Sequence, residues 1–324
     1  MSEISTRKVV LLDPGIASPS YERVLFQQHG YDFQVFDGKK GDYHKKLEVA
    51  SDAVGLLIRF TEIDEHFLQH TPDLKAIARY GVGYDNIDLE ACTRHGVRCA
   101  NVQGYGNHSV SDHALALILA TIRQLIPGQH RIYENFSAPP SEDIPELHEM
   151  TLGIIGLGRI GGTMAEKAVP LFDSVIASDP YVDQEKFREK GVANVSLDEL
   201  LRESHVISIH CNLTEETRQM LNEDAFWQMG KRPVVVNTAR GGIIQEEALL
   251  SALDNDRIRG AGLDVFQTEL PEELNRDLVE HPRVIATGHY AWFSSRAQTE
   301  LQKRTADNLL AMLRGELPGD CLNP

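Results

Sequence analysis

Short apolar runs alternate with longer amphipathic segments along nearly the whole chain. Such runs, separated by segments of helix length, predict parallel strands joined by helices that cover both faces of a sheet. The strands predicted before residue 105 are Val9–Leu12, Phe33–Phe36, Val54–Ile58, Ala76–Ala78 and Val97–Ala100. Those predicted after residue 150 are Leu152–Ile155, Val175–Ser178, Val206–Ile209, Val234–Asn237, Gly262–Asp264 and Val284–Ala286. The pattern therefore predicts the α/β class, with two blocks of βα units that form two domains.

A long helix is predicted between the two blocks. Residues Asn107–Leu125 have the length and composition of a helix, and Ser109 and Asp112 have the spacing of an N-terminal capping box. The stretch Ala114–Ala120 is apolar on every side, so it needs packing partners all round. Burial inside its own domain would supply them, and so would a contact between two-fold-related subunits, which we favour. The proline-rich, acidic segment Ser137–Glu149 is predicted to be a surface loop.

The composition limits the classes of partner. With 324 residues, of which 42% are hydrophobic, the chain is long enough for one large or two medium domains with sizeable cores. Its formal net charge is −16 and it has no long Lys/Arg block, so nucleic acid is not expected as a partner, because phosphate backbones require a basic face. A small basic cluster is expected to be solvated surface: Lys39, Lys40, Lys45 and Lys46.

Cysteine usage and the N-terminal residues predict a cytoplasmic protein. The four cysteines show neither C-x-x-C spacing nor a metal-like grouping, as expected of free thiols in a reducing compartment. The first residues lack the apolar region of a signal peptide, and the longest apolar run, Ala114–Ile122, is too short to cross a bilayer. The 13 histidines show no zinc-ligand spacing, so no metal is expected.

The segment Thr151–Gly162 predicts a dinucleotide site. A short apolar run leads into glycines 156, 158 and 161, which have the G-x-G-x-x-G spacing. In this motif Gly156 allows the tight turn, Gly158 lets the backbone approach a pyrophosphate, and Gly161 lets the helix pack on the strand. Asp179 ends the next predicted strand about 20 residues later, where a carboxylate binds the adenosine ribose hydroxyls and repels a 2′-phosphate. This indicates NAD rather than NADP, and the alternative is an ordinary βα turn.

Three later residues indicate a reaction. Arg240, Glu269 and His289 each follow a predicted strand, at the edge where open α/β sheets bind ligands. Reduction of a 2-keto acid requires a proton on the carbonyl oxygen. Histidine titrates near neutral pH, and a carboxylate beside an imidazole favours its protonated form. An arginine fork can grip a carboxylate with two hydrogen bonds. Singly, each residue could be an ordinary surface or structural group; together they predict a substrate clamp, an acid/base and its partner.

The chain resembles the D-isomer-specific 2-hydroxyacid dehydrogenases, in particular the branch with phosphoglycerate dehydrogenases and C-terminal binding proteins. The resemblance covers nearly the whole chain and rests on these segments, besides the glycine motif and Asp179: RYGVGYDNID (Arg79–Asp88), HCNLTEET (His210–Thr217), VNTARGGII (Val236–Ile244), AGLDVFQTE (Ala261–Glu269) and GHYAWFS (Gly288–Ser294). It implies two Rossmann-like doubly wound parallel-sheet domains. The discontinuous substrate domain comprises residues 1–101 and 289–324, with a last helix at Ser295–Arg314 ended by Gly315. The NAD-binding domain comprises residues 102–288.

The resemblance also implies roles for individual residues and a two-fold dimer. Arg240, Glu269 and His289 would be catalytic. Cofactor contacts would come from Gly156, Gly158, Arg159, Ile160, Gly161, Asp179, Cys211, Thr238 and Asp264. Substrate contacts would come from Arg59, Arg79, Val82, Gly83 and Trp292, with Phe60, Tyr80 and Tyr105 as further apolar wall. The substrate would be a small anionic 2-keto or 2-hydroxy acid.

The sequence departs from the family pattern at two places and leaves alternatives open. Gly288 stands where many members have Pro before the catalytic His, which loosens the backbone that aims His289, and Asn212 also replaces a Pro. The GHYAWFS segment leaves an NAD(H)-sensing protein-binding module as an alternative. Dehydrogenation of another small anion such as phosphite is a second alternative. Formate is disfavoured, because formate dehydrogenases of this superfamily carry Gln where Glu269 stands.

Overall fold

The computed structural model describes residues 7–15, 17–39, 41–132 and 143–324, and the chain divides into two compact units. Unit 1 comprises residues 1–105 and 294–324, and unit 2 comprises residues 106–293. The functional division expected at 101/102 and 288/289 stays a prediction. Both units are parallel α/β structures, as the sequence predicts.

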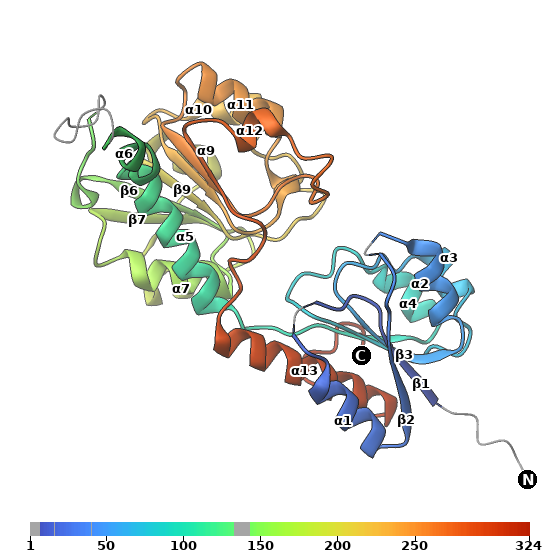
Figure 1. Ribbon diagram of the computed structural model, residues 1–324. Helices are drawn as coiled ribbons and strands as arrows, with labels where there is room; N and C mark the ends of the chain where they lie inside the picture. The colour runs from blue at the N-terminus through green and yellow to red at the C-terminus, as the bar shows by residue number, and fades with distance from the viewer. Residues whose placement is uncertain (1–6, 16, 40, 133–142) are drawn as a thin grey trace, which may run out of the picture. The chain divides into compact units, whose positions relative to one another are not determined.

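Unit 1 is built on a five-stranded parallel sheet in the order β2-β1-β3-β4-β5 (Figure 1). Its strands are β1 (Arg7–Leu11), β2 (Tyr31–Val35), β3 (Ala53–Ile58), β4 (Ala76–Arg79) and β5 (Arg98–Ala100). The strand order reverses between β1 and β3. In doubly wound sheets the carboxyl ends of the strands at such a reversal are the place where ligands bind.

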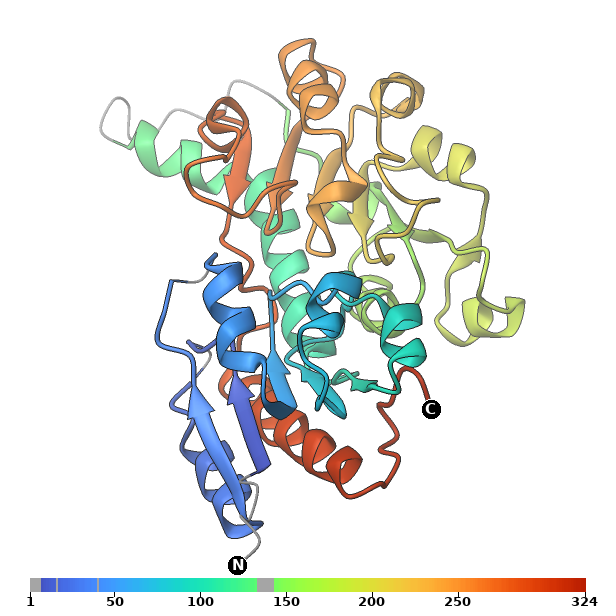
Figure 2. The ribbon, with the colours of Figure 1, turned by 90° about the vertical axis from the view of Figure 1, so that its right-hand side faces the viewer.

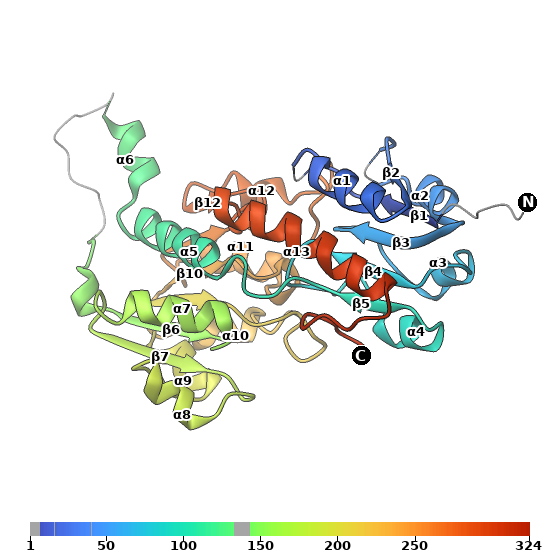
Figure 3. The ribbon, with the colours of Figure 1, turned by 90° about the horizontal axis from the view of Figure 1, so that it is seen from below.

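Helices cover both faces of this sheet. One face packs against α1 (Ser20–Gln28) and α13 (Ser295–Leu313); the other packs against α2 (Tyr43–Ala50), α3 (Glu65–Gln69) and α4 (Leu89–Arg94). Figures 2 and 3 show α13 lying across the strands of unit 1. Gly55 of β3 makes this approach feasible, since a Cβ there would lie 3.0 Å from Leu313 Cδ1. Ser294 caps the helix by accepting from Ala297 N at 3.1 Å, and Gly315 (φ 84°) ends it, as predicted.

Unit 2 is built on a seven-stranded parallel sheet in the order β12-β11-β10-β9-β6-β7-β8. Its strands are β6 (Thr151–Ile155), β7 (Ser174–Ser178), β8 (Ala193–Asn194), β9 (Val206–Ile209), β10 (Val234–Asn237), β11 (Gly260–Leu263) and β12 (Val284–Ala286). The sequence pattern missed only β8, which has two exposed residues and therefore no apolar run.

The helices of unit 2 enclose two separate apolar cores. On one face lie α5 (Asn107–Ile122), α7 (Arg159–Ala168) and α8 (Gln184–Glu189); on the other lie α9 (Leu197–Glu203), α10 (Glu223–Gln228) and α11 (Glu246–Asp254). Two short helices, α6 (Leu125–Arg131) and α12 (Arg276–Val279), complete the unit. Gly262 lets α5 approach the sheet closely, because a Cβ there would lie 2.8 Å from Leu117 Cβ.

Helix α5 begins at the predicted residue, but its N-terminal cap and its end differ from the prediction. The helix begins at Asn107 with Gly106 as N-cap and no side-chain cap, so the predicted capping box of Ser109 and Asp112 is wrong. Asp112 instead pairs with Lys167 of α7 at 2.6 Å, because it lies one turn inside the helix. At the other end Gln124 adopts φ 51°, which separates α6 from α5.

Helix α5 buries one side in unit 2 rather than being enclosed all round. Ala114, Leu117 and Ile118 are buried against the sheet and α7, whereas Ala116 is exposed. The loop predicted at Ser137–Glu149 lies in part outside the described residues, and its last three residues form a 3₁₀ turn, Leu147–Glu149. Among the described residues, no helix has the length and apolar character needed to span a membrane.

The predicted solvated basic cluster is wrong for one of its lysines. Lys39 and Lys45 are exposed, and Lys40 lies outside the described residues. Lys46 is only 3% exposed and forms an ion pair with buried Asp13 at 2.6 Å. Lys46 lies on the inward side of α2, so the tertiary position of the helix, not the local charge pattern, decides its surroundings.

Candidate active site

The turn between β6 and α7 has the shape that the glycine spacing predicts. Gly156 has φ 90°, and a Cβ there would lie 2.6 Å from Cys211 N. A Cβ at Gly161 would lie 2.0 Å from Gly156 O, so only glycine lets the helix meet the strand. At Gly158, by contrast, a Cβ would meet no described atom within 4 Å. Space is therefore left in front of the α7 N-terminus, where backbone N–H groups favour an anion.

Asp179 is held directly beside this turn. Its Oδ2 accepts from Leu157 N at 2.8 Å, and its Oδ1 accepts from Tyr181 N at 2.9 Å. These two bonds fix the orientation of the carboxylate at the end of β7, and each oxygen retains a lone pair for a further donor. A ribose diol could supply such donors, whereas a 2′-phosphate would be repelled.

The neighbouring strand ends provide a neutral wall. Burial raises the pKa of Cys211 to about 12 and lowers that of His210 to about 4, so both are uncharged at neutral pH. Thr238, only 8% exposed, has an Oγ1 that is buried without a hydrogen-bond partner among the described residues. An unsatisfied buried hydroxyl needs an explanation, and a polar group of a bound cofactor would satisfy it. The open space at Gly158, Asp179 and Thr238 together fit NAD.

Three adjacent strands carry the predicted catalytic residues. Arg240 follows β10, Glu269 follows β11, and His289 follows β12. Because these strands are neighbours in a parallel sheet, their carboxyl ends share one edge. His289 Nδ1 and Glu269 Oε1 lie 2.6 Å apart, a contact with the length of a hydrogen bond but not its alignment. The imidazole therefore presents its other nitrogen, Nε2, away from the carboxylate.

Arg240 is positioned by its own loop. Its backbone carbonyl accepts from Asn237 Nδ2 at 2.9 Å, and its guanidinium donates to Ala239 O at 2.8 Å. The residue is the N-cap of a 3₁₀ turn, Gly241–Ile243. A Cβ at Gly241 would lie 1.9 Å from the Phe266 carbonyl carbon, so the loops after β10 and β11 pack backbone to backbone.

Asp264, predicted to lie beside the nicotinamide carboxamide, accepts hydrogen bonds from the loop that carries His289. Its carboxylate is buried (1% exposed) and accepts from Thr287 Oγ1 at 2.5 Å, Tyr290 N at 3.1 Å and Ala291 N at 2.8 Å. Its backbone carbonyl accepts from His289 N at 2.7 Å. Trp292, predicted to line the substrate pocket, donates from Nε1 to His289 O at 3.2 Å. Both residues therefore contact the segment that carries His289.

The substrate residues expected in unit 1 lie at the ends of two neighbouring strands. Arg59 follows β3, and Arg79 ends β4, ahead of Val82 and Gly83. Arg79 is only 7% exposed; it donates to Asn86 Oδ1 at 3.0 Å and to Tyr80 O at 3.1 Å. Its guanidinium lies directly under Gly81, where a Cβ would be 2.4 Å from Nη1.

A buried aspartate, which the sequence interpretation missed, holds the loop after β3. Asp13 Oδ2 accepts from the backbone N–H groups of Arg59, Phe60 and Thr61, each at 2.8 Å, and from Thr61 Oγ1 at 2.9 Å. Lys46 Nζ donates to Asp13 Oδ1 at 2.6 Å and to Thr61 Oγ1 at 3.0 Å. Burial acts to raise the pKa of Asp13, but these donors outweigh it, and the net effect lowers the pKa.

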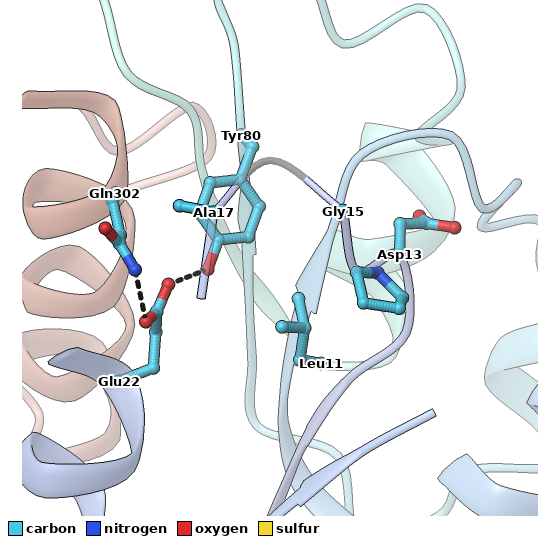
Figure 4. A pocket seen from close by; sticks show the side chains of 8 residues that line it. Leu11, Asp13, Gly15, Ala17, Glu22, Tyr80 and Gln302 are labelled. Carbon is cyan, nitrogen blue, oxygen red and sulfur yellow. Dashed lines mark hydrogen bonds between the residues drawn. The ribbon is translucent and has the colours of Figure 1, made fainter. Parts of the chain in front are cut away.

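Near Asp13, unit 1 contains a pocket that is too small for a substrate. Its volume is about 10 Å³, room for about one water molecule. Figure 4 shows Glu22 at its edge, where the carboxylate accepts from Tyr80 Oη at 2.7 Å and from Gln302 Nε2 at 2.8 Å. Burial, and then Glu22, raise the pKa of Tyr80 well above its usual range, so its hydroxyl stays a donor. The pocket is lined by Leu11, Asp13, Pro14, Gly15, Ala17, Glu22, Tyr80 and Gln302.

Several of these residues left little signal in the sequence. Asp13 and Thr287 follow predicted strands, so their position at a strand end was visible, but their partners were not. Lys46 and His113, whose Nε2 lies 3.0 Å from Thr287 Oγ1, lie within helices and gave no signal of a role. Among the described residues, no group of three or more His, Cys, Asp and Glu side chains is placed to hold a metal ion.

Comparison with known proteins places this geometry in a family. The NAD-binding domain of the D-isomer specific 2-hydroxyacid dehydrogenases matches residues 115–291. D-3-phosphoglycerate dehydrogenase of Mycobacterium bovis is 35% identical over 283 residues, which are 87% of this chain and 53% of that protein. The chain thus spans about half the length of such curated relatives. Glyoxylate reductase of Korarchaeum cryptofilum is 33% identical over 282 residues, 86% of this chain and 85% of that protein.

A solved structure extends the similarity to the fold. The crystal structure of D-lactate dehydrogenase from Aquifex aeolicus, complexed with NAD and lactic acid, has a TM-score of 0.87 at 28% identity and covers 98% of this chain and 99% of that one. The resemblance inferred from the sequence motifs is therefore confirmed. The chain belongs to the D-isomer specific 2-hydroxyacid dehydrogenase family.

Proposed function

We propose that the protein is an NAD-dependent oxidoreductase that interconverts a small 2-keto acid and a D-2-hydroxy acid. The observation that carries the proposal is the contact between His289 Nδ1 and Glu269 Oε1 at 2.6 Å. It lies at the sheet edge that also carries Arg240, in the unit with the glycine turn. Relatives named for 3-phosphoglycerate, glyoxylate and D-lactate support the substrate class.

His289 is proposed as the acid/base. Glu269 contacts Nδ1, so Nε2 is the atom left to give a proton to the substrate carbonyl oxygen, or to take one from the hydroxyl in the reverse direction. Glu269, in contact with Nδ1, is proposed to hold the orientation of the ring. NADH, when bound, supplies the hydride that adds to C2 of the keto acid.

Arg240 is proposed as the carboxylate clamp. Its planar guanidinium can donate two parallel hydrogen bonds to the substrate carboxylate, which fixes C2 relative to the proton donor. Arg59, Arg79, Val82, Gly83 and Trp292 are proposed as further substrate contacts, on the strength of the family resemblance alone. Gly156, Gly158, Arg159, Ile160 and Gly161 are proposed to bind the pyrophosphate, and Asp179, Cys211, Thr238 and Asp264 to contact the rest of NAD.

A panel of 2-keto acids tests the proposal. Glyoxylate, pyruvate, hydroxypyruvate, 3-phosphohydroxypyruvate and aromatic 2-keto acids are offered with NADH, and absorbance at 340 nm reports oxidation of the cofactor. We expect turnover with at least one acid, and a loss of kcat of about 10²–10⁴-fold in His289→Gln. Equal efficiency with NADPH would contradict the role of Asp179. NADH binding without turnover of any acid would favour the NAD(H)-sensing alternative.

We also propose a two-fold homodimer. Ala116 on α5 is exposed, and on α6 Leu125 and Ile126 are 57% and 48% exposed. An apolar face of this kind suits a self-complementary contact between two copies. Light scattering should give twice the mass of 36.2 kDa. A monomer at micromolar concentration would contradict the dimer and leave the catalytic proposal intact.

A further inference from the structure

The backbone at His289 is strained. Its φ is 54°, in the left-handed region that non-glycine residues seldom adopt. The preceding Gly288 does not restrain this conformation, because a glycine has no Cβ to restrict its own backbone dihedral angles. A strained residue keeps such a conformation only when the structure around it over-determines it. The groups that hold residues 287–291 therefore decide where the imidazole of His289 points.

Asp264 is the centre of that support. Its backbone carbonyl accepts from His289 N, and its two carboxylate oxygens accept from Tyr290 N and Ala291 N. Three consecutive backbone N–H groups, those of residues 289–291, thus donate to one residue, Asp264, through its backbone carbonyl and its carboxylate. The position of the Asp264 carboxylate must be fixed for this arrangement to aim His289.

A chain of donors fixes the carboxylate from helix α5. Thr287 Oγ1 lies 2.5 Å from Asp264 Oδ1 and 3.0 Å from His113 Nε2. The threonine hydroxyl has a single proton, and the carboxylate can only accept, so that proton lies toward Asp264. Thr287 Oγ1 must then accept from His113, which carries its proton on Nε2. His113 Nε2 is also 3.7 Å from Asp264 Oδ1.

Helix α5, which carries His113, is itself held in place by hydrogen bonds from α7. Lys167 of α7 donates to Ser111 Oγ and Asp112 Oδ1, both at 2.6 Å, and to the His108 carbonyl at 3.0 Å. The ring of His113 also packs edge-on against Tyr290, with centroids 5.2 Å apart and an angle of 77° between planes. His113 therefore contacts the His289 segment twice, through a hydrogen bond and through a ring contact.

We propose that His113 is a positioning residue for His289, acting through Thr287 and Asp264. It has no direct part in proton transfer. It orients the threonine hydroxyl toward Asp264, which holds the carboxylate in place to bind the backbone of residues 289–291. This inference rests on the proposed function where it predicts a change in kcat. Amide hydrogen exchange at residues 290 and 291 tests it independently of activity.

The test compares two substitutions at position 113. His113→Leu removes the donor, whereas His113→Gln keeps an N–H at a similar distance from the backbone. We expect His113→Leu to lower kcat about 10–100-fold, because a displacement of about 1 Å of a reacting group can cost that much. It should also speed amide exchange at Tyr290 and Ala291. His113→Gln should restore kcat to within about threefold of wild type, as rescue by a retained donor.

Controls separate positioning from general damage. His108→Leu changes an exposed histidine on the same helix and should leave kcat and exchange unchanged. We measure kcat at saturating NADH, because Asp264, whose carboxylate His113 helps to hold, is itself a proposed cofactor contact. Thr287→Val should reproduce the effects and Thr287→Ser should not, which keeps the test valid if His113→Leu fails to fold.

The outcomes are distinct for the two proposals. Unchanged kcat and unchanged exchange at Tyr290 and Ala291 in both His113→Leu and Thr287→Val would overturn the positioning role. Equal losses in His113→Gln and His113→Leu would also overturn it, because the donor would then be irrelevant. If the wild-type protein reduces no 2-keto acid, the proposed function fails, and the exchange data still decide whether His113 holds the loop.

Discussion

Loss of the Asp13 carboxylate should destabilise unit 1 more than loss of its partner Lys46. Five donors surround the carboxylate: the backbone N–H groups of residues 59–61, Thr61 Oγ1 and Lys46 Nζ. Asp13→Asn places an NH₂ group where an acceptor is required. In either amide orientation it faces donors, the three N–H groups or the ammonium. Removing one partner of a buried ion pair costs about 3–5 kcal/mol, and we expect this cost for Asp13→Asn.

Lys46→Met should cost less, about 1–3 kcal/mol, which is the size of one or two charge-assisted hydrogen bonds. After this change the carboxylate keeps four of its donors, so its charge remains compensated. In Asp13→Asn, by contrast, the Lys46 ammonium loses its carboxylate partner and keeps the neutral Thr61 Oγ1 as an acceptor. In Asp13→Asn/Lys46→Met the buried cation is absent, so the double variant should be more stable than the sum of the two single losses implies.

The assay must report on unit 1 alone. Both tryptophans, Trp227 and Trp292, lie in unit 2, so tryptophan emission in urea serves as the internal control. Hydrogen exchange at the amides of residues 59–61, which donate to Asp13, measures the effect directly. A loss below about 1 kcal/mol in Asp13→Asn, or a larger loss in Lys46→Met than in Asp13→Asn, would refute the reasoning.

Three further predictions concern unit 2. Gly161→Ala should unfold or distort the β6–α7 turn, since its Cβ would lie 2.0 Å from Gly156 O. Gly158→Ala should fold normally and weaken NADH binding at least about 10-fold. Circular dichroism reports the folding of each variant, and fluorescence titration reports its affinity for NADH. The pKa of His210 is lowered from 6.5 to about 4, so the unfolded chain takes up a proton first and stability is lost as the pH falls from about 6.5 toward 4. Because the residue as a whole is only partly buried, we expect this group to account for about 1–2 kcal/mol at pH 5. Urea midpoints of His210→Gln should therefore fall less steeply than those of wild type between pH 7 and 5, and parallel curves would contradict this expectation. Arg240→Lys should raise KM for the keto acid about 10-fold or more, since lysine lacks the planar fork, and an unchanged KM would argue against the clamp.

Most of the architecture follows from local patterns in the sequence. The strands appear as short apolar runs because parallel strands covered on both faces need apolar side chains on both sides. The glycine turn was also recognisable, because each of its three positions has its own steric or spatial requirement. Gly315 ended the last helix as predicted, in a left-handed conformation.

Two predictions were wrong because the residues concerned bind partners that are distant in the sequence. The capping box of Ser109 and Asp112 fitted a local rule, but Asp112 pairs with Lys167, which is more than 50 residues away in the sequence. Lys46 belonged to a basic run, yet its helix turns it inward onto Asp13, 33 positions earlier.

What the sequence by itself determined are the elements, the glycine turn and the order of Arg240, Glu269 and His289 along the chain. What only the tertiary structure decided is which polar groups meet. Examples are Asp13 with the amides of residues 59–61, and His113 with Thr287. Backbone periodicity depends on near neighbours and is therefore written in short stretches of sequence. A buried hydrogen bond depends on the separation of atoms from distant segments, which is fixed only when the sheets and helices have packed.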